Sequence, residues 1–261
     1  MSAAMGTDLA QALARAQAAS RPAIAAFLTA GFPTRDAFPA TLLAISRVAD
    51  LIEVGVPFSD PMADGLTIQR ASRAALAGGV NLEWILDSLR ATASQLAAPV
   101  VLMSYLNPLL AFGLERLAER AALSRVRGFI VPDLPLEESE PLRGALQANG
   151  LGLIQLVSPL TSPERLKRIA EASHGFLYAV TRLGTTGGRA EIPPETSDYL
   201  DRVRALSPVP VLAGFGVRTA AQVRALAAHA DGVIVGSALI EAVERGEDPA
   251  RFLAELSGGP Q

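Results

Sequence analysis

Short apolar runs alternate with amphipathic segments along almost the whole chain, and this alternation limits the folds open to it. Each run is rich in Val, Ile, Leu, Phe and Ala, which is typical of strands buried on both faces of a parallel sheet. The runs expected to be strands are 23–29, 51–54, 100–103, 128–131, 153–156, 176–180, 209–213 and 232–235.

The segments between these runs have helical spacing and helix-end signals. Ser162-Pro163-Glu164 combines a good N-cap, a first-turn proline and an acidic group at the positive end of the helix dipole. Thr219 is a second expected N-cap, and Asn149-Gly150 is expected to end a helix in the left-handed conformation. Strands therefore alternate with helices.

Eight strands, each followed by a helical segment, predict a closed (β/α)8 barrel, a fold of typically ~250 residues; an open doubly wound sheet is the alternative. An extra helix is expected at 7–19, before the first strand. Residues 55–99 hold two helical stretches, 67–77 and 81–96, and are expected to form an insertion after strand 2. No linker divides the chain, so residues 1–261 are expected to form a single barrel domain.

Composition excludes several classes of function. The chain has no cysteine and a net charge of −3, so thiolate chemistry and a basic surface for nucleic acid or anionic membrane are not expected. We find no apolar run long enough to span a bilayer, which takes about 20 residues, and we expect no signal peptide. A cytoplasmic location is expected.

The few histidines and the single lysine narrow the chemistry further. In a (β/α)8 barrel the active site lies at the C-terminal ends of the strands. His174 and His229 precede strands, at the opposite end, so a Ser–His pair is not expected, and a metal site would need carboxylates alone. Lys167 lies in the middle of an outer helix, where it cannot form an imine inside the barrel. Acid–base chemistry is left mainly to carboxylates and tyrosines.

Acidic residues follow or end three of the expected strands. Glu53 lies within an apolar strand, where burial would raise its pKa toward a range useful for acid–base catalysis; the alternative is a structural carboxyl group bonded to backbone or water. Asp60 and Asp64 lie in the next loop, where a turn-forming role is the alternative. For Asp133, after the fourth strand, a turn role is favoured.

Glycine-rich turns follow the last strands. Gly214-Phe215-Gly216 follows strand 7, and Gly236-Ser237 follows strand 8 and opens a helix. This is where barrels commonly bind a phosphate, although glycines also serve tight turns. The pair of motifs favours a substrate with one phosphate monoester. Residues 182–189, rich in Gly and Thr, are typical of a mobile lid or of a plain loop.

Residues 51–69, LIEVGVPFSDPMADGLTIQ, resemble the signature of the tryptophan synthase alpha chain family. Shorter matches occur before and after this stretch, in the same order as in that family. They lie at 27–33, 102–108, 132–138, 182–187, 214–216 and 235–237. The resemblance implies a TIM barrel that cleaves indole-3-glycerol phosphate to indole and glyceraldehyde 3-phosphate by a retro-aldol reaction. It implies no cofactor and no metal for this chain.

The resemblance also assigns roles to residues. Glu53 matches the general acid/base, Asp64 the carboxylate that holds the indole N–H, and Tyr178 a tyrosine near the catalytic glutamate. The residues that match substrate-binding positions are Phe27, Met103, Phe215 and Ile234 beside the indole, Gly187, Gly216, Gly236 and Ser237 at the phosphate, and Thr186 in the lid.

Family members act as α2β2 complexes that pass indole to a pyridoxal-phosphate β chain, so the resemblance implies that partner. The residues that match its docking surface are Asp60, Pro61, Asn107 and Pro108. Two positions depart from the family pattern: Leu66 replaces the usual proline, which predicts a looser Asp64 loop, and Ser104 replaces threonine. Three alternatives stay open: a stand-alone lyase, a non-catalytic partner of a β chain, and an isomerase of a sugar phosphate.

Overall fold

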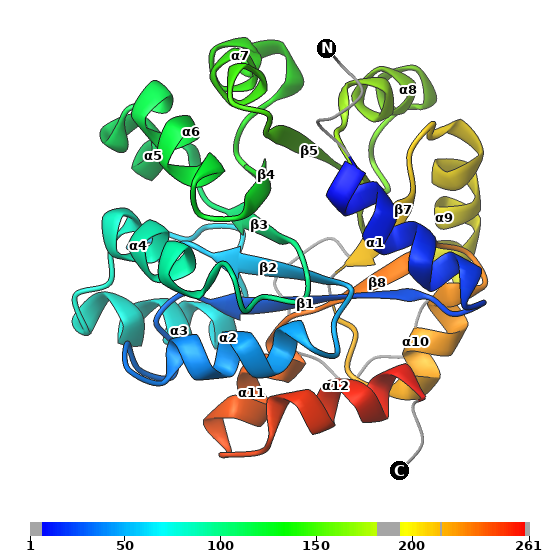
Figure 1. Cartoon of the computed structure of the whole chain (residues 1–261). Helices are drawn as coiled ribbons and strands as arrows, with labels where there is room; N and C mark the ends of the chain where they lie inside the picture. Colours follow the sequence, from blue (N-terminus) through cyan, green and yellow to red (C-terminus); the bar gives the residue numbers. More distant parts are fainter. Residues whose placement is uncertain (1–6, 182–193, 215, 259–261) are drawn as a thin grey trace.

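A computed structural model of the chain describes residues 7–181, 194–214 and 216–258 (Figure 1). Its strands are all parallel and close into a barrel in chain order, which confirms the predicted (β/α)8 barrel over the open sheet. The strands are β1 Ala23–Thr29, β2 Leu51–Gly55, β3 Val100–Met103, β4 Val126–Ile130, β5 Gly152–Val157, β6 Leu177–Val180, β7 Val211–Gly214 and β8 Gly232–Val235.

Helices surround this barrel (Figure 1). They are α1 Thr7–Ala18, α2 Phe38–Ser46, α3 Leu66–Ala77, α4 Leu82–Thr92, α5 Leu106–Phe112, α6 Leu114–Ala122, the 3-10 helix η1 Leu136–Glu138, α7 Glu140–Ala148, α8 Pro163–Ala172, α9 Pro194–Leu206, α10 Ala220–Ala227, α11 Ser237–Glu244 and α12 Pro249–Ser257. None of these helices is long and apolar enough to cross a membrane.

The strand sequences are continuously apolar because both faces of each strand are buried. One set of side chains, which includes Leu51, Val101 and Ile130, fills the barrel interior, and the alternate set packs against the surrounding helices. The interior cluster also contains Leu9 and Leu13 of α1. The predicted N-terminal helix is therefore present and covers one end of the barrel (Figure 1).

The helical insertion after strand 2 is confirmed as α3 and α4. The side chain of Asn81 accepts a hydrogen bond from the Trp84 N–H and caps α4. The prediction that this helix runs to residue 96 is wrong, because α4 ends at Thr92 and a turn follows, closed by a bond from the Gln95 N–H to the Thr92 carbonyl.

The predicted helix ends are confirmed. Ser162 accepts a hydrogen bond from the Arg165 N–H, and Thr219 forms a reciprocal capping box with Gln222. Gly150 has a φ of +72°, in the left-handed region. Strand 7 begins at residue 211, two residues later than expected, because Pro210 has no N–H to donate to a neighbouring strand. The N–H of Val211 donates to the Asp231 carboxylate at 2.8 Å.

Candidate active site

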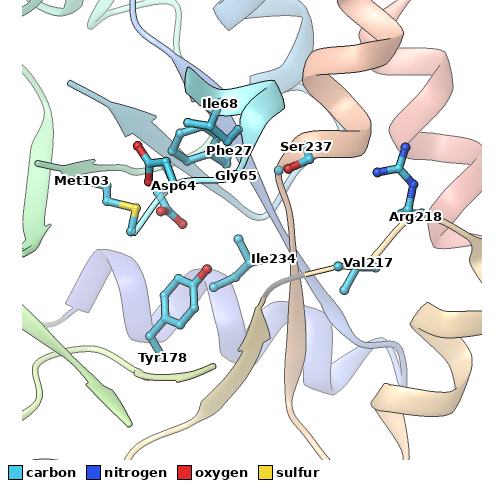
Figure 2. Close-up of a pocket in the computed structure, with 13 residues that line it drawn as sticks. Phe27, Asp64, Gly65, Ile68, Met103, Tyr178, Val217, Arg218, Ile234 and Ser237 are labelled. Carbon is cyan, nitrogen blue, oxygen red and sulfur yellow. The ribbon is translucent and has the colours of Figure 1, made fainter. Parts of the chain in front are cut away.

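A pocket opens where the C-terminal ends of the strands meet the following loops (Figure 2). The space between its walls, including the open mouth, is about 630 Å³. The lining residues are Phe27, Glu53, Asp64, Gly65, Ile68, Met103, Tyr178, Gly216, Val217, Arg218, Ile234, Gly236 and Ser237. They come from segments far apart in the sequence, which the barrel brings to one mouth.

Glu53 lies at the centre of β2, on the face that points into the barrel. It is level with Phe27 of β1 and Val101 of β3, and its side chain is buried, with a residue exposure of 1%. Among the described residues no group hydrogen-bonds Oε2 of Glu53. Burial, and next the negative charge of Asp64, raise the pKa of Glu53 to about 8. The expected upward shift is therefore present.

Asp64 lies in the loop that joins β2 to α3. Its backbone N–H bonds the Pro61 carbonyl at 3.1 Å, and its carbonyl accepts a bond from Nε2 of Gln69 at 2.9 Å. Burial raises the pKa of Asp64 to about 6, although a hydrogen bond from Tyr105 acts in the opposite direction. Leu66 is the first residue of α3 and is largely exposed.

Tyr105 is a site residue that sequence reasoning missed. Its hydroxyl accepts a hydrogen bond of 2.9 Å from the Ala63 N–H and also bonds the Asp64 carboxylate. Its ring packs against Phe58, with 5.3 Å between ring centroids. The signal was present in the sequence, since an aromatic residue with a polar tip lies two residues after the third strand, where barrels place functional groups.

Tyr178 comes from β6 and points between Asp64 and Ile234 (Figure 2). It is buried, and desolvation, followed by the charges of Glu53 and Asp64, raises its pKa well above the ordinary value. Its ring lies directly over Gly214 at the end of β7, because a Cβ added to that glycine would lie 2.4 Å from the Tyr178 hydroxyl. Phe27 covers Gly55 in a similar way.

The glycine-rich turns lie together at one side of the pocket. Gly216 has a φ of +89°, which explains its residue type, and Gly236 is followed at once by α11. The N-terminus of α11, with Ser237, therefore faces the pocket with backbone N–H groups suited to an anion (Figure 2). The predicted residues Thr186, Gly187 and Phe215 lie outside the described residues.

The predicted docking residues occupy two adjoining segments at the rim. Asp60 and Pro61 precede Ala63, which bonds Tyr105, and Asn107 and Pro108 lie in the first turn of α5, immediately after Tyr105. Met62, in the same loop, is 91% exposed. The hydrogen bond between Ala63 and Tyr105 holds these two segments close to each other.

The remaining candidates lie elsewhere. His174 packs over Gly152 at the start of β5, and His229 bonds Asp201 at 2.8 Å; neither lines the pocket. Lys167 is exposed on α8. Asp133 accepts bonds from the Leu106 N–H, at 3.0 and 3.2 Å to its two oxygens, and so supports the start of α5. Within the described ranges no cluster of three metal-ligating residues occurs.

Comparison with known proteins finds matches to tryptophan synthase alpha chains. The family model described as "Tryptophan synthase alpha chain" matches residues 13–257. The tryptophan synthase alpha chain of Desulfovibrio desulfuricans is 48% identical over 242 residues, covering 92% of this chain and 95% of the relative. That of Roseiflexus sp. is 43% identical over 258 residues, with 96% and 99% covered. A chain of Mycobacterium tuberculosis tryptophan synthase superposes with a TM-score of 0.88 at 39% identity, covering 96% and 97%.

Proposed function

The chain belongs to the tryptophan synthase alpha chain family, and we propose that it cleaves indole-3-glycerol phosphate to indole and glyceraldehyde 3-phosphate. The observation that carries this proposal is the pairing of the buried carboxyl group of Glu53 with the half-buried carboxyl group of Asp64, in one pocket that also reaches the N-terminus of α11. A carbon–carbon lyase of this kind needs an acid–base group, a counter-charge and a phosphate cradle. We also infer that the enzyme works in the cytoplasm, where amino-acid biosynthesis takes place.

Glu53 is the acid–base residue in this proposal. With a pKa of about 8 it is mostly protonated at neutral pH and can donate its proton to C3 of the indole. The resulting carboxylate then takes the proton of the substrate's neighbouring hydroxyl. The carbon–carbon bond breaks, its electron pair returns to the indole ring, and the hydroxyl carbon becomes an aldehyde. Glu53 ends protonated, as it began.

Asp64 supplies the counter-charge. Protonation at C3 leaves a positive charge on the ring nitrogen, and an ionised carboxylate at the N–H stabilises it. The pKa of about 6 keeps Asp64 mainly ionised at neutral pH, whereas Glu53 stays protonated. Phe27, Met103 and Ile234 supply apolar surface for the indole, and Gly216, Gly236 and Ser237 supply the phosphate end.

The test is release of indole from indole-3-glycerol phosphate by the purified chain. Glu53→Gln and Asp64→Asn should each lower kcat by about 10²–10⁴-fold, the usual scale for such groups. Both variants keep the size of the side chain, so circular dichroism should report an unchanged fold. Unchanged turnover in Glu53→Gln would show that the catalytic assignment is wrong.

We further propose that a β chain docks on the rim formed by Asp60, Pro61, Asn107 and Pro108. The exposed apolar side chain of Met62 beside them fits a surface that is covered in a complex. Titration of the chain with a tryptophan synthase β chain should accelerate indole formation and give an α2β2 assembly by light scattering. Full activity without any response to the β chain would favour a stand-alone lyase instead.

A further inference from the structure

The pocket is poorly matched in charge to a phosphorylated ligand. Of its two carboxyl groups, Asp64 is mainly ionised at neutral pH, and the proposed substrate itself carries up to two negative charges on its phosphate. Among the described lining residues, Arg218 is the one cationic side chain. It lies on the Ser237 side of the pocket, away from Met103 (Figure 2). Its position is therefore at the phosphate end.

Arg218 is held by the helix whose N-terminus forms that end. Its guanidinium pairs with Oε2 of Glu241, in the second turn of α11, and its backbone N–H donates to Oε1 of Gln222 at 2.8 Å. The two side chains of the ion pair remain 27% and 22% exposed. The backbone of Arg218 is thus fixed at the wall of the pocket, whereas its long side chain extends to Glu241 and is not fully buried there.

We propose that Arg218 binds the phosphate of the substrate and that Glu241 restrains it when the pocket is empty. This inference rests on the proposed function, because it takes a phosphate monoester as the ligand. A guanidinium donates two parallel hydrogen bonds to phosphate oxygens, and a bound phosphate competes with the Glu241 carboxylate for the same donors. Arg218 adds a charge-assisted contact to the neutral amides of the glycine turns.

Glu241 also contacts the segment that follows Asp64, so a change in the partner of Arg218 can affect that segment. Its Oε1 accepts a hydrogen bond of 3.0 Å from the hydroxyl of Thr67, three residues after Asp64. Arg218 and Thr67 therefore hold one carboxylate from two sides, and movement of Arg218 toward phosphate leaves Glu241 with the hydrogen bond from Thr67 and the nearby charge of Arg245. Binding of phosphate at Arg218 therefore changes the contacts of Glu241, which in turn bonds Thr67 at the start of α3.

The test measures affinity for inorganic phosphate and, separately, for indole. Arg218→Gln should raise the Kd for phosphate about tenfold and leave the Kd for indole unchanged. Glu241→Gln keeps an acceptor for Thr67 but removes the competing charge, so it should lower the Kd for phosphate, by about threefold. The double variant should match Arg218→Gln, since Glu241 acts through Arg218.

Arg70→Gln is the matched control. Arg70 of α3 pairs with Glu244 of α11 at 2.9 Å, between the helices that also carry Thr67 and Glu241, but it does not line the pocket, so its loss should leave both Kd values unchanged. Equal phosphate affinity in wild type and Arg218→Gln, or weaker binding in Glu241→Gln, would overturn the inference. Absence of indole release by the wild-type chain would instead contradict the proposed function, so the two failures are distinguishable.

Discussion

The hydroxyl of Tyr105 hydrogen-bonds the carboxylate of Asp64 and holds the pKa of that group below the value that burial would otherwise set. The hydroxyl oxygen already accepts the N–H of Ala63, so its one proton is available to Asp64. A donated bond favours the ionised form of an acid. Tyr105 therefore acts as a positioning residue that helps Asp64 to stay ionised while Glu53 stays protonated.

Replacing Tyr105 by phenylalanine removes this bond and leaves the Ala63 N–H without its acceptor. We expect the pKa of Asp64 to rise, so that the acid limb of the profile of kcat/KM against pH moves to higher pH. The loss of kcat at neutral pH should be about tenfold, and activity should recover in part at higher pH.

Tyr199→Phe is the matched control for that variant. The Tyr199 hydroxyl donates to the Val157 carbonyl at 3.0 Å, and the residue does not line the pocket. Its loss should cost about 1 kcal/mol of the free energy of unfolding without moving the pH profile. A pH profile of Tyr105→Phe that coincides with wild type would contradict the role of Tyr105.

The burial of Glu53 should make the protein less stable as pH rises. The pKa of this group is 4.5 in its ordinary state and about 8 in the folded chain, so between these values the folded state binds more protons than the unfolded state. The free energy of unfolding therefore falls with rising pH, by about 1.4 kcal/mol per unit at most, across the window from about 4.5 to about 8.

Glu53→Gln should remove this fall. Chemical denaturation at a series of pH values should measure the free energy of unfolding of both proteins. From pH 5 to pH 8 this free energy should rise in the variant relative to wild type by a few kcal/mol. In Asp64→Asn the fall should persist but end at a lower pH, because the charge that helps to raise the pKa of Glu53 is gone. Parallel curves for wild type and Glu53→Gln would argue against a buried, proton-binding Glu53.

Gly214 is required by the ring of Tyr178. An alanine Cβ at this position would lie 2.4 Å from both Cε1 and the hydroxyl of Tyr178, so the ring must move within the pocket. We expect Gly214→Ala to lower kcat/KM by about ten- to a hundredfold, measured as indole release. Gly144→Ala, in α7 with open space at the added Cβ, should leave activity unchanged and stabilise the chain by about 0.5–1 kcal/mol.

The N-terminal helix α1 should contribute to stability but not to catalysis. Leu9 is buried in the cluster that fills the barrel interior, and it contacts Gly175, which precedes β6. Leu9→Ala should cost about 2–4 kcal/mol, seen as a lower Tm, with KM unchanged below the transition. The exposed Leu123 is the control, since its replacement by alanine should change stability by less than about 0.5 kcal/mol.

The order of elements and the placement of Glu53 were readable in the sequence because they follow from local patterns. Strands buried on both faces leave continuous apolar runs, and a carboxyl group inside such a run, as at Glu53, stands out against its neighbours. The caps at Ser162 and Thr219 are equally local, since each needs a side chain and a backbone N–H within three residues.

Contacts between distant segments could not be read in this way. Three such contacts join residues from different β/α units of the barrel. They are the bond from Tyr105 to Asp64, the packing of the Tyr178 ring over Gly214, and the bonds of Glu241 to both Arg218 and Thr67. Periodicity specifies which face of a strand is buried, but closure of the barrel sets which side chains meet across its mouth. The pKa values of the two carboxyl groups depend on that closure, because desolvation and mutual charge act through space.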